Sequence, residues 1–164
     1  MSYQKKRVIV SLVSGSLFIL AYCTFLASGL ASGAFVDKDL QFWAQTMLQF
    51  VGVGAVASIA AQIVFHFAYS AAIAAEMGKT KGEALDKAIK ASMVEDEMDK
   101  LIGLKSSRIA FVFAGFGFVA ALFALALDAA PPLMLNIVFV SFLLGAVLEG
   151  IGHLYFYKKG VRNG

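Results

Sequence analysis

The sequence predicts an all-α integral membrane protein, a bundle of four transmembrane helices that forms a single membrane domain over residues 1–164. Three observations predict this fold class. Hydrophobic residues make up 60% of the chain and charged residues only 15%, whereas a soluble domain is about 45–50% apolar and about 25% charged. The apolar residues fall into four long runs, and the basic residues gather on one side of those runs.

Each run is long enough to cross a bilayer, which takes about 20 apolar residues in a helix. We expect the spanning helices at about 8–30, 42–75, 109–127 and 133–157. The second run exceeds the length that a span needs, so its helix should tilt or project into the cytoplasm. The first run follows three basic residues, as in a signal peptide. It is longer than the usual apolar core of about 7–15 residues, so we expect a retained helix.

Lysine and arginine counts predict the orientation. Three basic residues precede the first run, seven lie between the second and third runs and three follow the fourth, thirteen in all, whereas the opposite side holds only Lys38. Because basic segments stay in the cytoplasm, we expect both termini and the loop at 76–107 to lie inside. Trp43 at the outer face and Tyr155 and Tyr157 at the inner face suit aromatic belts.

The cytoplasmic loop at 76–107 carries a helical pattern from Glu83 onward. Apolar residues recur every four positions in two stripes, formed by Leu85, Ile89 and Met93 and by Val94, Met98 and Ile102. This pattern predicts an amphipathic helix that lies on the membrane surface or against a partner. A solvated connector is the alternative that the pattern leaves open.

Polar side chains within the spans are the candidate functional residues, because such groups are costly inside a membrane. Glu149 and His153 are four residues apart in the fourth run and share one helix face, which two glycines flank. Gln62 and His66 share a face of the second run in the same way. These two helices run in the same direction, so we expect the four side chains to form an intramembrane polar cluster in the cytoplasmic half.

The cluster has three interpretations. A hydrogen-bonded network would fix the register of the helices. A proton or ion pathway would use the carboxylate and the histidines, as in pumps and transporters. A metal site would use His66, Glu149 and His153, because two histidines and a carboxylate are a known ligand set for zinc or iron. The two histidines of the chain also allow a haem pair. We expect neither a bound metal nor a cofactor.

Other classes of function find little support. The sequence contains no GxSxG, HExxH or P-loop pattern, so we predict no catalytic residues and no enzymatic activity. The net charge of +3 comes without the clustered basic face of a nucleic-acid binder. The single cysteine, Cys23, excludes an intrachain disulfide.

A charged segment precedes the third run. Residues 95–109 read Glu-Asp-Glu-Met-Asp-Lys-Leu-Ile-Gly-Leu-Lys-Ser-Ser-Arg-Ile. They fit the pattern Asp-Glu-Arg-Asp-x-Leu-Ile-x-x-Lys-x-x-Arg at Asp96, Glu97, Asp99, Leu101, Ile102, Lys105 and Arg108. Met98 departs from it where an arginine is usual. Asn136 and the segments 141–144 and 154–161 add to the likeness.

In these features the chain resembles a prokaryotic family of predicted four-helix membrane proteins whose function is not established. The resemblance implies the same topology and a multi-pass location in the prokaryotic cytoplasmic membrane. Some relatives in that family sit beside small helix-turn-helix regulators, which implies a membrane-linked regulatory or immunity role.

The charged residues of this signature have two interpretations. Lys105 and Arg108 can reach phosphate headgroups and anchor the third helix, while Asp96, Glu97 and Asp99 stay in water. Alternatively, the segment forms a docking surface for a cytoplasmic partner.

Taken with the fold, these patterns predict a non-enzymatic membrane protein that is a regulatory or accessory subunit of a larger complex. Its expected partners are the lipid bilayer and another membrane protein or a second copy of itself, and not nucleic acid. The alternative is a small oligomeric transporter or channel component with an intramembrane Glu/His site for protons or ions.

Overall fold

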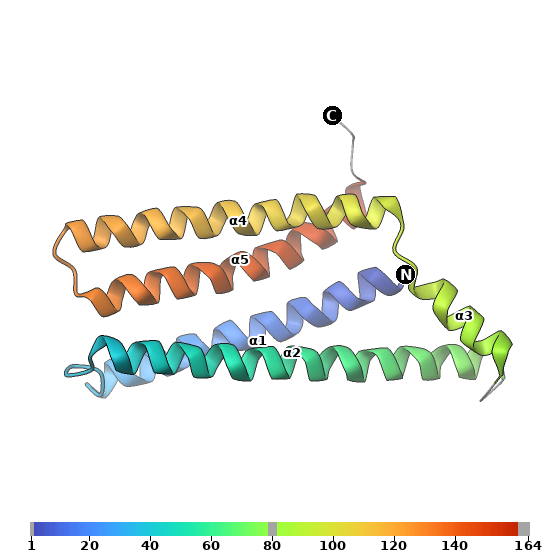
Figure 1. Cartoon of the computed structure of the whole chain (residues 1–164), viewed down its shortest axis with the longest axis horizontal. Coiled ribbons are helices and arrows are strands. Elements are labelled where there is room, and N and C mark those ends of the chain that lie inside the picture. Colours follow the sequence, from blue (N-terminus) through green and yellow to red (C-terminus); the bar gives the residue numbers. More distant parts are fainter. Residues whose placement is uncertain (1, 79–81, 161–164) are drawn as a thin grey trace.

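The computed structural model of the chain describes residues 2–78 and 82–160, and it is all-helical across them apart from short connections. The helices are α1 (Tyr3–Ala31), α2 (Leu40–Glu76), α3 (Glu83–Met93), α4 (Glu97–Ala126) and α5 (Pro131–Lys159) (Figure 1). Four of them, α1, α2, α4 and α5, are long and apolar enough to cross a membrane. The predicted class, an all-α multi-pass membrane protein, is confirmed.

Local sequence signals mark where the helices begin. Asp39 caps α2 by accepting a hydrogen bond from the backbone N–H of Phe42 (2.9 Å). Two prolines occupy the first turn of α5, where their missing N–H groups would have no helical partner anyway. At the other end of α5, Gly160 has φ 78°, a conformation that costs glycine little and ends the helix.

The chain folds as two antiparallel hairpins, α1 with α2 and α4 with α5, which meet where α1 packs along α5 (Figure 1). The most extensive contact is between α4 and α5. The start of α1, the end of α5 and the whole of α3 lie at one end of the bundle, and the two short connections lie at the other (Figure 1). Which end faces the cytoplasm stays a prediction. Three residues of the charge count, Lys79, Lys81 and Arg162, lie outside the described residues.

Small side chains allow α4 and α5 to approach each other closely along their length. The facing pairs are Gly117 with Ser141, Gly145 with Ala110, and Gly152 with Ser106. A Cβ atom built on Gly145 would lie 3.0 Å from the carbonyl oxygen of Ala110. Membrane helices commonly pack through such small residues, because lipid supplies no hydrophobic drive for their association.

An aromatic core fills the half of the bundle that holds the short connections. Tyr22 is 0% exposed, and its hydroxyl donates to Oδ1 of Asn136 (2.7 Å). Its ring packs edge-on against Phe50 and Phe139. Trp43 is also buried, with its ring 4.8 Å from that of Phe35. Trp43 therefore packs against Phe35 of the 32–39 connection, and its place in an aromatic belt at the outer face stays a prediction.

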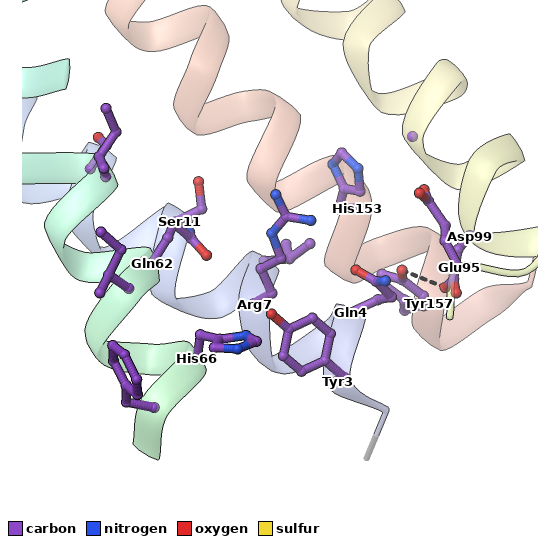
Figure 2. A pocket seen from close by; sticks show the side chains of 16 residues that line it. Tyr3, Gln4, Arg7, Ser11, Gln62, His66, Glu95, Asp99, His153 and Tyr157 are labelled. Carbon is purple, nitrogen blue, oxygen red and sulfur yellow. Dashed lines mark hydrogen bonds between the residues drawn. The ribbon is translucent and has the colours of Figure 1, made fainter. Parts of the chain in front are cut away.

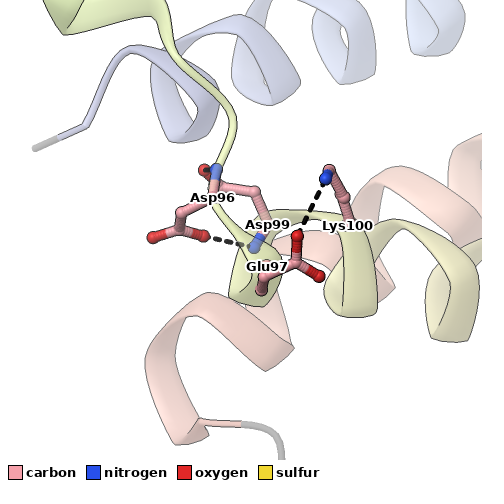
Figure 3. Close-up of polar contacts among 4 residues, drawn as sticks. All are labelled: Asp96, Glu97, Asp99 and Lys100. Carbon is pink, nitrogen blue, oxygen red and sulfur yellow. Dashed lines mark hydrogen bonds and ion pairs between the residues drawn. The ribbon is translucent and has the colours of Figure 1, made fainter.

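The segment expected as one amphipathic helix after residue 83 is divided in the structure. Its first part is α3, which buries Leu85. Residues 94–96 then break the helix, and the third spanning helix begins at Glu97 instead of near residue 109. Asp96 and Asp99 form a capping box, in which Asp96 accepts from the N–H of Asp99 (2.7 Å) and Asp99 accepts from that of Asp96 (3.2 Å) (Figure 3). This reciprocal cap favours a helix start at that point.

The length of α2 agrees with its long apolar run. Its 37 residues span roughly 55 Å at 1.5 Å per residue, against a hydrocarbon core of about 30 Å. A helix of this length must tilt or extend beyond the bilayer core, and α3 packs back against its end and against α1.

Candidate functional site

A groove lined by both polar and apolar side chains lies between α1, α2, α4 and α5 in the half of the bundle that carries α3 (Figure 2). Its cavity volume is about 1020 Å³. Along the bundle, the groove runs from the level of Ser11 and Ser58 to the level of Tyr3 and Tyr157 at the end that carries α3. This groove, which we call the inner groove, is the candidate functional site.

On α1, the side chains of Gln4, Arg7 and Ser11 follow one another at helical spacing and line the inner groove. Arg7 is exposed and makes no hydrogen bond or ion pair with another described residue. Gln4 donates from Nε2 to the carbonyl oxygen of Met93 (3.2 Å). That bond holds the end of α3 against the start of α1.

On α2, Ser58, Gln62 and His66 recur every four residues and present a polar stripe to the groove. The ring of Tyr3 packs 4.9 Å from that of Tyr69, so the start of α1 is held against this part of α2. Figure 2 shows Arg7 and His66 extending toward the middle of the groove from α1 and α2.

The facing wall comes from α5 and from the start of α4. The Tyr157 hydroxyl donates to Oδ1 of Asp99 (2.6 Å), which ties the end of α5 to the start of α4. Nδ1 of His153 lies 3.0 Å from the carbonyl oxygen of Glu149. A carbonyl only accepts, so Nδ1 carries the proton and Nε2 remains for the groove. Gly103 lies opposite, and a Cβ there would stand 3.9 Å from Nε2.

Charges of opposite sign therefore occur among the residues that line the groove. Arg7 lies on the α1 side, whereas Asp99 and Glu95 lie at the α3–α4 junction (Figure 2). Glu95 accepts no hydrogen bond from a described residue. The arrangement can hold a ligand that carries both a cationic and an anionic group.

The predicted polar cluster is only partly assembled. Gln62, His66 and His153 line the inner groove together, but Glu149 does not. The Glu149 carboxylate accepts a hydrogen bond from the Ser107 hydroxyl of α4 (2.6 Å). Among the described residues, the hydrogen-bond partner of the Glu149 carboxylate is therefore Ser107 and not a histidine of the predicted cluster.

The rotation of α5 explains this difference. Four helical residues advance the chain by about one turn plus 40°, so Glu149 and His153 point in related but distinct directions. The glycines at 145 and 152 pack against α4. This contact sets the rotation of α5 so that the Glu149 side chain points toward α4 and the His153 side chain faces the groove. In the part of the chain that the structure describes, no three His, Cys, Asp or Glu side chains are grouped to hold a metal. The candidate metal set of His66, Glu149 and His153 is therefore not assembled.

The charged signature residues take several structural roles. Asp96 and Asp99 cap α4, and Asp99 also holds Tyr157. Glu97 forms an ion pair with Lys100 (2.9 Å; Figure 3), which is solvent-exposed and so contributes little to stability. Lys105 and Arg108 border a shallow apolar depression on α4. This placement is compatible with both readings of the signature, headgroup contact and partner docking.

Sequence reasoning missed two groups of groove residues. The charge count uses Arg7 only to orient the chain, but its spacing from Gln4 and Ser11 places all three on one helix face. Glu95 lies in the charged segment 95–109, and no local signal places it in the same groove as Arg7. The chain matches no protein-family model, no curated protein and no solved structure. The resemblance at 95–109 stays a prediction.

Proposed function

We propose that this chain is a non-enzymatic regulatory or accessory subunit of a larger membrane complex. Its place would be the cytoplasmic membrane of a prokaryote, with both termini inside. The observation that carries the proposal is the composition of the inner groove. Membrane helices supply Arg7 and His66, and the junction between α3 and α4 supplies Glu95. An occupant of the groove would therefore contact the membrane helices and the segment that carries α3 at the same time.

This arrangement supports a coupling between the groove and α3. The described contacts that hold α3 are few: the Gln4 bond to Met93 and the burial of Leu85 are the main ones. A ligand that binds one position of a loosely held element better than another shifts the population toward that position. Groove occupancy would thus change how α3 is presented.

The outer face of α3 is the surface proposed to meet the partner. Glu83, Asp86, Lys87 and Lys90 are exposed along it. A surface with both positive and negative charges determines how a protein partner is oriented more than how tightly it binds. The partner would be another membrane protein with a cytoplasmic surface or a second copy of this chain.

Recovery of partners from native membranes tests the proposal. The full chain, tagged and purified in mild detergent, is compared as wild type, Lys87→Glu and Lys38→Glu. The second variant makes the same charge reversal at the opposite end of the bundle. We expect one protein to be recovered in near-stoichiometric amount with the wild type and with Lys38→Glu, and several-fold less with Lys87→Glu. Equal recovery in all three samples, or no stoichiometric protein in any, would contradict the proposal.

A second candidate function is a proton or ion pathway in an oligomer. The observation that favours it is that Gln62, His66 and His153 line one cavity, which reaches the level of Ser58 midway along α2. Proteoliposomes with an imposed pH gradient test this alternative. Proton flux above that of protein-free vesicles, lost in His153→Gln, would support it over the subunit proposal.

A further inference from the structure

We infer that the inner groove binds the headgroup of a zwitterionic phospholipid with a primary amine, of the phosphatidylethanolamine type. The lipid phosphate would lie at Arg7, and the ammonium would lie at Glu95 and Asp99. This inference rests on the proposed function, since it names the ligand of the same groove.

The phosphate end of the site is the side formed by α1 and α2. Arg7 points its guanidinium into the cavity without a hydrogen bond or ion pair to another described residue. Its planar fork of donors matches phosphate oxygens, and hydrogen bonds of this charged kind are among the stronger ones in proteins. Gln62 and His66, on the neighbouring helix, add further donors within the same cavity.

The ammonium end is the side formed by the α3–α4 junction. The Glu95 carboxylate accepts no hydrogen bond from a described residue. Asp99 accepts from Tyr157 and from the backbone of Asp96, and a carboxylate has about four acceptor positions, so it can accept another. A primary ammonium offers three N–H donors to such oxygens. A quaternary ammonium offers none, so it cannot donate a hydrogen bond to Glu95 or Asp99.

Apolar side chains next to the charged ones indicate a lipid instead of a soluble zwitterion. Ile59, Ile63 and Phe67 line the same cavity and are 61%, 51% and 69% exposed. They lie on α2, which makes no extensive contact with α4. The cavity is thus flanked by apolar α2 surface on which an acyl chain can lie while the headgroup remains inside.

Two variants address the site, each with a matched control. Arg7→Gln removes the phosphate contact, and Lys5→Gln removes a neighbouring charge that does not line the groove. Gly103→Phe fills the space in front of His153, whereas Gly115→Phe places the same ring on the same helix where a Cβ meets no atom within 4 Å. All variants are checked for helix content and thermal unfolding in detergent before lipid is added.

The delipidated full chain in detergent is then incubated with phosphatidylethanolamine, phosphatidylcholine and phosphatidylglycerol of identical acyl chains, and bound lipid is counted by native mass spectrometry. We expect phosphatidylethanolamine to bind at a stoichiometry of one and about tenfold more tightly than the other two, because each of them lacks one charged hydrogen-bonding group. Arg7→Gln and Gly103→Phe should weaken this binding by about tenfold or more, and Lys5→Gln and Gly115→Phe should not.

Equal binding of the three lipids, equal loss in the control variants or no bound lipid would overturn the inference. Competition by free phosphoethanolamine at the concentration of the lipid would also overturn it, because the acyl chains would then be irrelevant. Lipid binding that follows the variants, without any partner recovered from native membranes, would uphold the lipid site and refute the proposed function. If a partner is recovered with the wild type but the wild type binds the three lipids equally, the proposed function would be upheld and the lipid site refuted.

Discussion

At Gly117, α4 approaches α5 so closely that one added methyl group should weaken the hairpin. A Cβ atom there would overlap Oγ and Cβ of Ser141, and the Ser141 Cβ is fixed to the backbone and cannot rotate away. Gly117→Ala must therefore separate the two helices or distort them. Overpacking of this kind costs about 1–3 kcal/mol.

The opposing term is helix propensity, since alanine in place of glycine within a helix gains about 1 kcal/mol. Gly115→Ala carries the same gain without the overlap, because a Cβ at that position meets no atom within 4 Å. The difference in unfolding free energy between the two variants therefore isolates the packing cost. We expect Gly117→Ala to be less stable than Gly115→Ala by about 1–3 kcal/mol.

Reversible unfolding in mixed detergent micelles, followed by circular dichroism, measures this difference. Ser141→Gly provides a further check, because it removes the side chain that the new methyl group meets. Combined with Gly117→Ala, it should restore part of the loss, with a coupling of about 0.5–3 kcal/mol in a double-mutant cycle. If Gly117→Ala is as stable as Gly115→Ala, or if the cycle shows no coupling, the close α4–α5 contact is wrong.

Three other predictions follow from the fold. Cysteines placed at Asp37 and at Lys87, in a background without the native cysteine, should differ in intact cells: an impermeant thiol reagent should label the first and not the second, and the opposite pattern would invert the topology. Glu149→Gln should keep the Ser107 bond and nearly all stability, whereas Glu149→Leu should lose about 1 kcal/mol; equal melting of both variants would mean that this bond contributes nothing. In hydrogen exchange, amides of α3 (Glu83–Met93) should be slower than those of the 94–96 break, and uniformly fast exchange would show that α3 is not a stable helix.

The spanning helices could be predicted from the sequence because their cause is local. Each apolar run is long enough to cross a bilayer, and only a helix satisfies every backbone group of a single segment in lipid. The same holds for α3, where the spacing of Leu85 and Ile89 specifies one apolar face. The start of α4 at Glu97 also has a local signal in the sequence, the Asp96–Asp99 capping box. The apolar spacing of Val94, Met98 and Ile102 runs across this cap and by itself indicates one continuous helix.

The candidate site could be predicted only in part, because its residues come from distant segments. The helical period places Gln62 with His66 and aligns Gln4, Arg7 and Ser11, but it does not say which helix each stripe faces. That choice depends on how far each helix is rotated about its axis. In α5 the rotation is set by the glycines that pack on α4.

The sequence by itself therefore determined the number and class of the membrane helices, since hydrophobicity and backbone hydrogen bonding act within each segment. Only the tertiary structure decided that Glu149 meets Ser107 and that Arg7 and Glu95 line the same groove. Both arrangements bring together residues far apart in the chain, and they depend on how the helices pack. A few small side chains control that packing, and no pattern within one helix encodes it.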